Sequence, residues 1–175
     1  MIVSERRKLR ELEITSKLAE LRCATAKQLV RMGVGGLGRG GVRNALRVLG
    51  EMERDGLLVS RRVGVKLFSV GGSFGHWEHS LWRNEFIIHV WGGLEGVRIE
   101  VPIKVGGVER LRADAGRFLG GKWTFLEVDR TGKPAEIRAK VRGYRELGLD
   151  LVVFCPKIRG KYWDCKQYYF EDTPG

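Results

Sequence analysis

The chain is strongly basic and contains enough apolar material for a folded core. It has 175 residues, with 32 Lys and Arg against 21 Asp and Glu, so its net charge at pH 7 is +11. Hydrophobic residues make up 43% of the chain, and no apolar run approaches the roughly 18 residues that span a membrane. These values exclude a disordered basic tail and a membrane-spanning protein, and they indicate a nucleic-acid partner.

The start of the chain and its cysteines favour a cytoplasmic protein. Residues 4–8 are Ser-Glu-Arg-Arg-Lys, so the chain leads into charge rather than into the apolar core of a secretion signal. The cysteines Cys23, Cys155 and Cys165 form no CxxC motif. We therefore expect reduced thiols that pack as small hydrophobic side chains.

The composition of the chain changes near residue 72. Of the sixteen aromatic residues, only Phe68 precedes this point. Residues 1–72 carry 15 Lys and Arg against 7 Asp and Glu, a net charge of +8, whereas residues 73–175 carry 17 against 14, a net charge of +3. The small residues around Gly71 and Gly72 suit a hinge. The sequence thus predicts two domains, residues 1–72 and 73–175.

The spacing of apolar residues predicts three helices and a hairpin in the first half. We expect helices over 5–22, over 24–32 with Thr25 as the cap, and over 42–52. Two β-prone runs within 57–70 meet near Gly64 and predict a β-hairpin. Residues 33–38 satisfy GxGxxG, but they follow a helix instead of a strand, so we interpret them as a glycine-rich turn and not as a dinucleotide site.

Side chains suited to DNA contact gather on the third of these helices and on the hairpin. They are Arg39, Arg43, Asn44, Arg47, Arg61, Arg62 and Lys66. Such groups neutralise phosphates and reach guanine edges. In residues 25–29, 42–49 and 53–58 the first half resembles winged helix-turn-helix DNA-binding domains, which implies double-stranded DNA as the partner. A winged helix that binds proteins is the alternative.

The second half predicts the element order αβββαβ, so the fold class of the whole chain is α+β. The expected elements are a helix over 76–91, strands over 98–105, 109–118 and 122–130, a helix over 134–147 and a strand over 149–155. A proline suited to the first helical turn opens the second of these helices. Residues 162–170 form a last strand or helix.

Acidic residues in this order predict a metal site. Glu127 and Asp129 lie two apart on a strand and project from one face, and Asp114 on the preceding strand would lie beside them. Three clustered acids repel one another unless a cation lies between them, so they predict bound Mg²⁺ or Mn²⁺ for phosphodiester hydrolysis. Glu85 and Lys140 place charges on the apolar stripes of the two helices, and each of these charges requires a partner.

At these residues the second half resembles the PD-(D/E)xK nuclease superfamily, which has a restriction-endonuclease-like fold. Asp114 would be the first acid of the motif, and residues 127–129 would be its second part. Active members usually have the catalytic lysine where this chain has Asp129, and in some members that lysine comes from the following helix. The resemblance therefore implies an Mg²⁺- or Mn²⁺-dependent endodeoxyribonuclease in which Lys140 takes this place and Glu85 is the helical acid.

The whole chain is also similar to the plasmid replication-relaxation family, which joins a winged helix to a nuclease-like domain. The matching stretches are residues 78–81, 112–115, 125–130 and 140–144. This similarity implies a role in plasmid or mobile-element replication or transfer. It implies replication or mobilisation proteins as further partners, and it leaves a homodimer open.

Two alternatives to the nuclease interpretation remain at this point. In the first, the protein is a non-enzymatic DNA-binding regulator whose nuclease-like domain is inactive and recruits a partner protein; Asp129 in place of lysine favours this. In the second, the three acids are surface residues paired with Arg112, Lys122 or Arg130, and Lys140 pairs with Glu136 one helical turn away.

Overall fold

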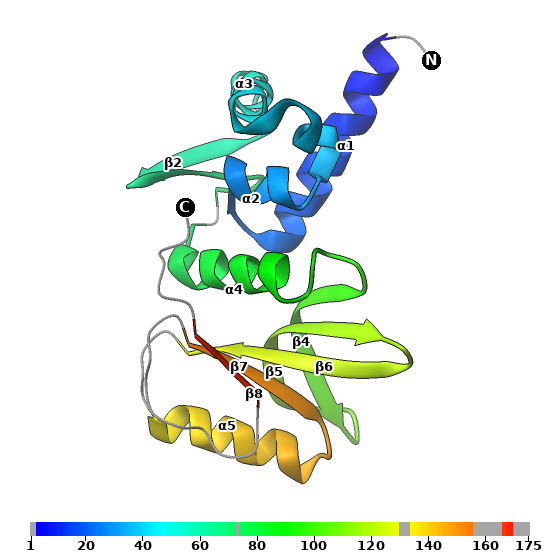
Figure 1. Cartoon of the computed structure of the whole chain (residues 1–175), viewed down its shortest axis with the longest axis vertical. Coiled ribbons are helices and arrows are strands. Elements are labelled where there is room, and N and C mark those ends of the chain that lie inside the picture. The colour runs from blue at the N-terminus through cyan, green and yellow to red at the C-terminus, as the bar shows by residue number, and fades with distance from the viewer. Residues whose placement is uncertain (1–2, 73, 130–133, 156–165, 170–175) are drawn as a thin grey trace. The chain divides into compact units, whose positions relative to one another are not determined.

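The computed structural model describes residues 3–72, 74–129, 134–155 and 166–169. The chain is an α+β protein (Figure 1) that divides into two compact units, of which the first ends at Gly93 and the second begins at Leu94. This division lies beyond the boundary expected at residue 72. The reason is that helix α4 (Trp77–His89) packs with the elements that precede it.

The first unit contains the three expected helices and the expected hairpin. Its elements before α4 are α1 (Val3–Leu21), β1 (Ala24–Thr25), α2 (Ala26–Arg31), the 3₁₀ segment η1 (Val34–Gly40), α3 (Gly41–Arg54), β2 (Val59–Val63) and β3 (Val65–Ser69). The short strand β1 was not predicted. It pairs with β3 and extends the hairpin to an antiparallel sheet of order β1-β3-β2.

Local sequence signals explain most of this unit. Thr25 accepts a hydrogen bond from the backbone N–H of Gln28, and the side chain of Gln28 accepts one from the backbone N–H of Thr25, so the predicted cap of α2 is a complete capping box. The glycine-rich stretch is more ordered than the expected turn, because Val34 and Leu37 of η1 are buried. A buried apolar anchor therefore fixes the connection between α2 and α3.

Buried polar side chains attach α4 to this unit. Arg83 is 1% exposed, and its Nη2 donates to the carbonyl of Leu21 at 2.7 Å. Asn84 donates to the carbonyl of Cys23 at 3.0 Å. The carbonyl of Leu21 lies at the end of α1, where helical carbonyls lack an intrahelical partner, and the carbonyl of Cys23 lies two residues beyond that end. These bonds explain why α4 belongs to the first unit.

The second unit is a five-stranded sheet with one described helix. Its elements are β4 (Val97–Val105), β5 (Val108–Leu119), β6 (Lys122–Val128), α5 (Pro134–Glu146), β7 (Asp150–Cys155) and β8 (Lys166–Tyr169), and the strand order is β4-β5-β6-β7-β8. Strands β4 to β6 are antiparallel, whereas β7 runs parallel to β6 and to β8. The predicted order after the first helix is thereby confirmed. Of residues 162–170, for which a strand or a helix was expected, the described residues 166–169 form a strand, and the others lie outside the described residues.

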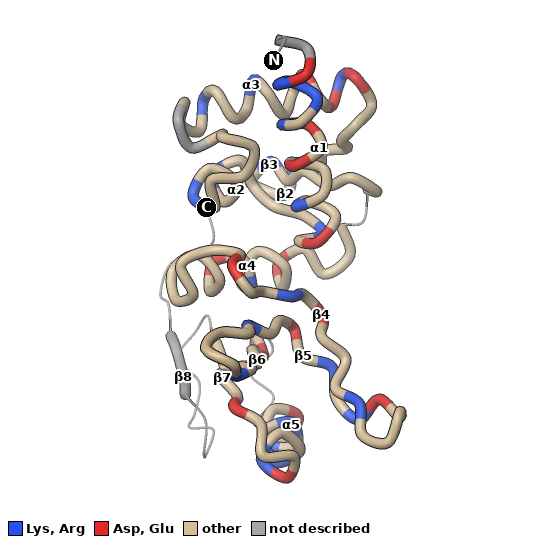
Figure 2. Tube along the Cα trace, turned by 90° about the vertical axis from the view of Figure 1, so that its right-hand side faces the viewer, with Lys and Arg blue, Asp and Glu red and all other residues tan. Residues whose placement is uncertain are grey.

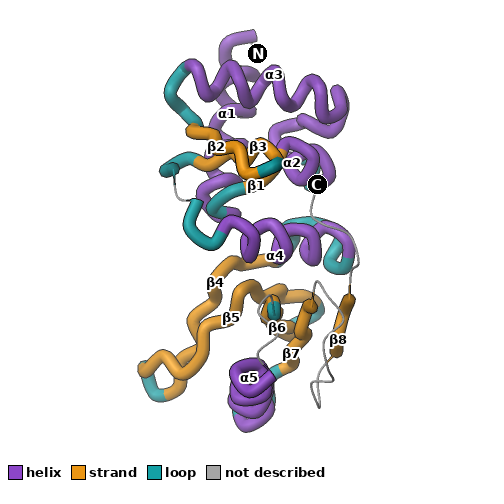
Figure 3. Tube along the Cα trace, turned by 90° about the vertical axis from the view of Figure 1, so that its left-hand side faces the viewer, coloured by secondary structure: helices purple, strands orange, loops and turns teal. Residues whose placement is uncertain are grey.

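Turns and a crossover produce this topology. Gly106 and Gly107, between β4 and β5, both have positive φ, as the two central residues of a tight primed hairpin turn require. A parallel pair cannot be joined in this way, and α5 supplies the crossover between β6 and β7. Ile137, Val141 and Tyr144 of α5 share one apolar core with side chains of the sheet, and Figure 3 shows α5 next to β7. This packing places one side of α5 over β6.

Two further sequence predictions can be compared with the fold. Cys23 and Cys155 are buried and form no disulfide among the described residues, as expected for reduced thiols, and Cys165 lies outside the described residues. In α1, Ile14, Leu18 and Leu21 are buried, but Leu9 and Leu12 are exposed, so the predicted apolar face holds only for the second part of that helix.

Among the described residues, no helix combines the length and the apolar character needed to cross a membrane.

Candidate functional site

A buried glutamate in the second unit binds a lysine and a tyrosine. Glu127 of β6 is 1% exposed, and its Oε2 accepts a short charge-assisted hydrogen bond from Nζ of Lys140. Its Oε1 accepts a hydrogen bond from the hydroxyl of Tyr144 at 2.9 Å. Lys140 and Tyr144 lie four residues apart on α5, so they are neighbours on one face of that helix. The predicted stripe of α5 therefore meets Glu127, which is the partner that the charge of Lys140 required.

Asp114 lies where β5 separates from β6. The paired register of these strands begins at Ala115 and Leu126, next to Asp114. Beyond it, Oδ2 of Asp114 accepts a hydrogen bond from the backbone N–H of Val128 at 2.7 Å. A side-chain carboxylate thus replaces the main-chain acceptor of the ladder. The result is that a second carboxylate lies within electrostatic range of Glu127.

Four neighbouring side chains form what we call the acid–lysine cluster: Asp114, Glu127, Lys140 and Tyr144. Burial and nearby charges shift the pKa values of the last three. Burial and the charge of Asp114 raise the pKa of Glu127 to about 7, although Lys140 and Tyr144 act in the opposite direction. Burial alone would lower the pKa of Lys140, but attraction to Glu127 outweighs it and the pKa is raised. Burial and Glu127 together raise the pKa of Tyr144. Perturbed groups of this kind concentrate at functional sites.

For two of the three acids, the structure corrects the interpretation as surface residues: Glu127 and Asp129 are 1% and 3% exposed, whereas Asp114 is partly exposed. Arg112 pairs with Glu109 and Lys122 pairs with Asp150, and Arg130 lies outside the described residues. Lys140 forms its ion pair with Glu127 and not with Glu136, which contributes only a longer-range attraction.

The predicted convergence of three acids is not what the described residues show. Asp129 follows β6, and its backbone N–H donates to the carbonyl of Phe154 at 2.9 Å. In the described part of the chain, no three His, Cys, Asp or Glu side chains are grouped so that they could hold a metal ion. The structure brings together Asp114, Glu127 and Lys140 instead. Tyr144 is the member that the sequence analysis gave no role, although its place four residues after Lys140 was a usable signal.

Glu85, the predicted helical acid, has its partners in the first unit. Its Oε1 accepts from Nε2 of Gln28 at 3.0 Å, and its Oε2 lies 3.3 Å from Nη1 of Arg31 and 3.1 Å from Nε2 of His89. Gln28 also donates to the carbonyl of Leu81. These contacts join α2 to α4. Glu85 therefore has partners within its own unit that account for its buried charge, and its expected part in the nuclease-like site stays a prediction.

The predicted DNA-contacting residues of the first unit fall into two groups according to their ion pairs. Figure 2 marks the Lys and Arg positions of the chain in blue. Arg43 on α3 and Arg61 and Arg62 on β2 are exposed, and none of the three has an ion-pair partner in the part of the chain that the structure describes. Three cationic side chains are thus available to a ligand.

The remaining basic side chains of this set are engaged within the unit. Arg47 pairs with Glu51 at 2.5 Å and donates to Asn44 at 3.1 Å. Lys66 pairs with Glu53 at 2.7 Å, and this bond together with one from Ser60 lowers the pKa of Glu53. These bonds connect β2 and β3 to α3. The side chain of Arg39 lies outside the described residues.

The comparisons with known proteins give no match. No protein-family model matches the chain, and no curated protein and no solved structure is significantly similar to it. The function must therefore be inferred from the geometry within each unit and from the resemblances in short motifs.

Proposed function

We propose that the protein binds double-stranded DNA through α3 and the β2–β3 hairpin of its first unit, acting as a winged helix. The observation that carries this proposal is the set of exposed arginines that have no ion-pair partner among the described residues, Arg43, Arg61 and Arg62. A cation that forms no intramolecular pair loses no such partner when it binds a phosphate, and each phosphate contact releases counterions. Exposed apolar side chains on α3, Val42 and Leu46, suit contact with thymine methyl groups.

The arrangement of this unit supports the same proposal. Helix α3 buries Ala45, Val48, Leu49 and Met52, so its opposite face is open to a ligand. Glu53 binds Ser60 of β2 and Lys66 of β3, and it thereby fixes the hairpin to the end of α3. A helix for the groove and a hairpin for the flanking backbone are the two contact elements of a winged helix.

Salt dependence and single substitutions test the binding. If three phosphates are neutralised, the affinity of the full chain for duplex DNA falls roughly 40-fold between about 50 and 200 mM salt. Arg43→Ala, Arg61→Ala and Arg62→Ala each weaken binding and each reduce the salt slope by about 1. Arg112→Ala, which removes an exposed arginine paired with Glu109 in the second unit, is the matched control. An affinity that does not change with salt, or an equal loss in the control, contradicts the proposal.

A second candidate function is cleavage of the bound DNA by the second unit as a PD-(D/E)xK-like nuclease. The observation that favours it is the position of Lys140: α5 brings this lysine to Glu127, with Asp114 alongside. This is where the resemblance implies the relocated lysine. The αβββαβ order also agrees with that superfamily, although α4 packs in the first unit.

The donor set suits Mg²⁺ or Mn²⁺. Magnesium is commonly held by one or two carboxylates together with phosphate oxygens and water, so Asp114 and Glu127 are sufficient without Asp129. Their mutual repulsion, which helps to raise the pKa of Glu127, is what a divalent cation would relieve. When bound, the ion would activate water and stabilise the leaving oxygen.

The residues of the chain have separate parts in such a reaction. Asp114 and Glu127 would hold the ion, and the hydroxyl of Tyr144 orients one oxygen of Glu127. The side chain of Lys140 is 42% exposed, so its ammonium can leave Glu127 and stabilise negative charge on an attacking oxygen. The short-motif resemblance is the support for proposing a role of this activity in plasmid or mobile-element replication or transfer. A chain that binds DNA and does not cleave it would be the non-enzymatic regulator.

A further inference from the structure

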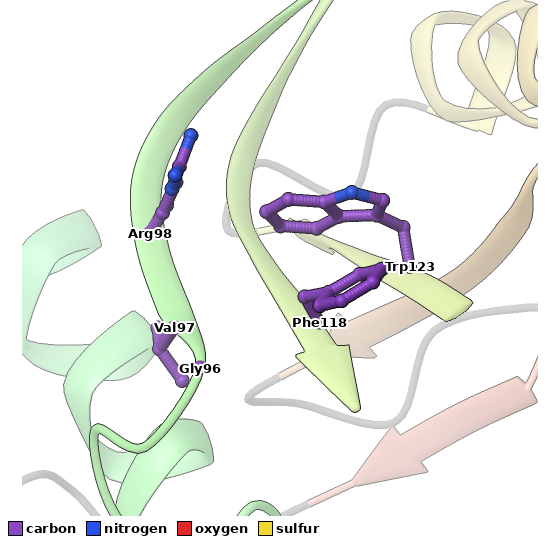
Figure 4. A pocket seen from close by; sticks show the side chains of 5 residues that line it. All are labelled: Gly96, Val97, Arg98, Phe118 and Trp123. Atoms are coloured by element: carbon purple, nitrogen blue, oxygen red, sulfur yellow. The ribbon is translucent and has the colours of Figure 1, made fainter. Parts of the chain in front are cut away.

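An open pocket of the second unit lies beside an aromatic pair and an arginine. It has a volume of about 420 Å³ and is lined by Gly96, Val97, Arg98, Phe118 and Trp123. Arg98 and Val97 extend from β4 on one side, and Phe118 and Trp123 form the other side (Figure 4). Pockets of this size accept small organic ligands.

Glycine and ring packing give the pocket its shape. The rings of Phe118 and Trp123 are 5.4 Å apart, and Trp123 stacks on Phe125 at 5.8 Å with an interplanar angle of 8°. A Cβ at Gly116 would come within 3.1 Å of the Trp123 ring, so the glycine lets this ring lie over β5. Trp123 is thereby held by its neighbours, while Phe118 remains 48% exposed at the pocket.

The charge of the pocket limits what it can bind. The guanidinium of Arg98 is 5.8 Å from the centre of the Trp123 ring, and Arg98 has no carboxylate partner among the described residues. A positive group here disfavours a cationic ligand and favours one that combines a planar ring with a negative charge. A nucleotide has both: its base can stack on Phe118 and its phosphate can bind Arg98.

The pocket also belongs to the same packed layer as the acid–lysine cluster. Trp123, Phe125 and Tyr144 share one apolar core, and the ring centres of Phe125 and Tyr144 are 5.7 Å apart. Tyr144 in turn donates to Glu127. A row of aromatic side chains thus connects the pocket to the buried carboxylate. A nucleic-acid strand bound in the pocket would occupy the same face of the β-sheet as Glu127.

We infer that this pocket binds an unpaired base of single-stranded DNA, so that the substrate of the second unit is DNA with an unpaired segment. Phe118 supplies the stacking face, and Arg98 binds the adjoining phosphate. The inference rests on the proposed function in that it takes DNA as the ligand. It goes beyond it by assigning single-stranded DNA to a surface separate from the duplex-binding arginines.

The test measures binding of the full chain to three fluorescent probes of equal length. They are an oligothymidine of about twelve nucleotides, an abasic strand with the same number of phosphates, and a duplex. We expect Phe118→Ala to weaken binding to oligothymidine roughly 5-fold or more and Phe118→Trp to restore it, because stacking depends on a ring and not on one side chain. Leu119→Ala, which removes a neighbouring side chain that is 59% exposed, is the control and leaves binding unchanged.

The probes separate failure of this inference from failure of the proposed function. On the abasic strand, Phe118→Ala and the wild type should bind alike; an equal weakening on both strands, or no weakening on oligothymidine, overturns the inference. Duplex binding should respond to Arg43→Ala and not to Phe118→Ala. If the wild-type chain does not bind the duplex but does bind oligothymidine in a way that depends on Phe118, the winged-helix proposal is rejected and the inference about the pocket stands. The melting temperature of each variant confirms that it is folded.

Discussion

Each unit of the protein buries a glutamate, and the two glutamates have different surroundings. Glu85 in the first unit is 8% exposed and lies among Gln28, Arg31 and His89, groups that donate to it or carry positive charge. Glu127 in the second unit is 1% exposed and has one cation, one hydroxyl and a second carboxylate nearby.

The difference indicates which of the two carboxylates has a role beyond stability. A carboxylate that only connects two helices needs donors, and Glu85 has them. A second acid beside a buried carboxylate destabilises the fold, so its presence near Glu127 requires another explanation, and binding of a cation provides one. The comparison thus distinguishes Glu85, a structural acid on a helix, from Glu127, a candidate catalytic acid on a strand.

Substitution of the two glutamates should affect stability very differently. Glu85→Ala leaves Gln28 and Arg31 without the acceptor that joins them to α4, and we expect a loss of about 3 kcal/mol in the free energy of unfolding. Glu127→Gln keeps an acceptor for Tyr144 and removes repulsion with Asp114, so the change should stay within about 1 kcal/mol. Denaturant unfolding of the full chain, with the two units fitted as separate transitions, measures both. Equal losses would contradict the distinction.

The pH dependence of stability should depend on Glu127. Its pKa in the folded state is raised to about 7, from an ordinary value of 4.5. The folded protein therefore binds the proton more tightly than the unfolded chain, and the resulting stabilisation is fully present below about pH 4.5 and lost as the pH rises through about 7. We expect this component to reach about 3 kcal/mol and to vanish in Glu127→Gln. Glu85→Gln should leave it in place, and a wild-type profile unaffected by Glu127→Gln would count against the raised pKa.

A divalent cation should produce a smaller effect that again depends on the second unit. At about ten times its dissociation constant, Mg²⁺ or Mn²⁺ bound only to the folded state adds roughly 1.4 kcal/mol, which raises the melting temperature by a few degrees. Asp114→Asn should abolish this shift, whereas Glu85→Gln should preserve it. A shift of the same size in Asp114→Asn would place the ion elsewhere.

Local features of this fold were predictable from the sequence, and features that depend on tertiary contacts were not. The helix expected over 42–52 spans Gly41–Arg54, and the hairpin turns at Gly64, because apolar spacing and glycine act within a few residues. The strand β1 consists of two residues and exists only because β3 is available to pair with it. No local signal could have revealed it.

The same limit applies to the candidate site. The apolar stripe of α5 showed that Lys140 needs an acidic partner, and the strand pattern placed Asp114 near Glu127. The pattern could not show that Asp114 ends the β5–β6 ladder by binding the N–H of Val128. It also gave no partner for Glu85, because a charge on an apolar stripe specifies that a partner exists and not which helix supplies it; Gln28 and Arg31 of α2 do so.

Cleavage of supercoiled DNA by the full chain in Mg²⁺ or Mn²⁺ is the most direct test of the distinction between the two glutamates. At equal DNA occupancy, the wild type and Glu85→Gln should cleave, while Glu127→Gln and Lys140→Ala should bind DNA equally well and cleave about 100-fold more slowly or not at all. Cleavage by Glu127→Gln at the wild-type rate would contradict the account. So would a wild type that binds DNA and leaves it intact with both ions, and the protein would then be a DNA-binding regulator.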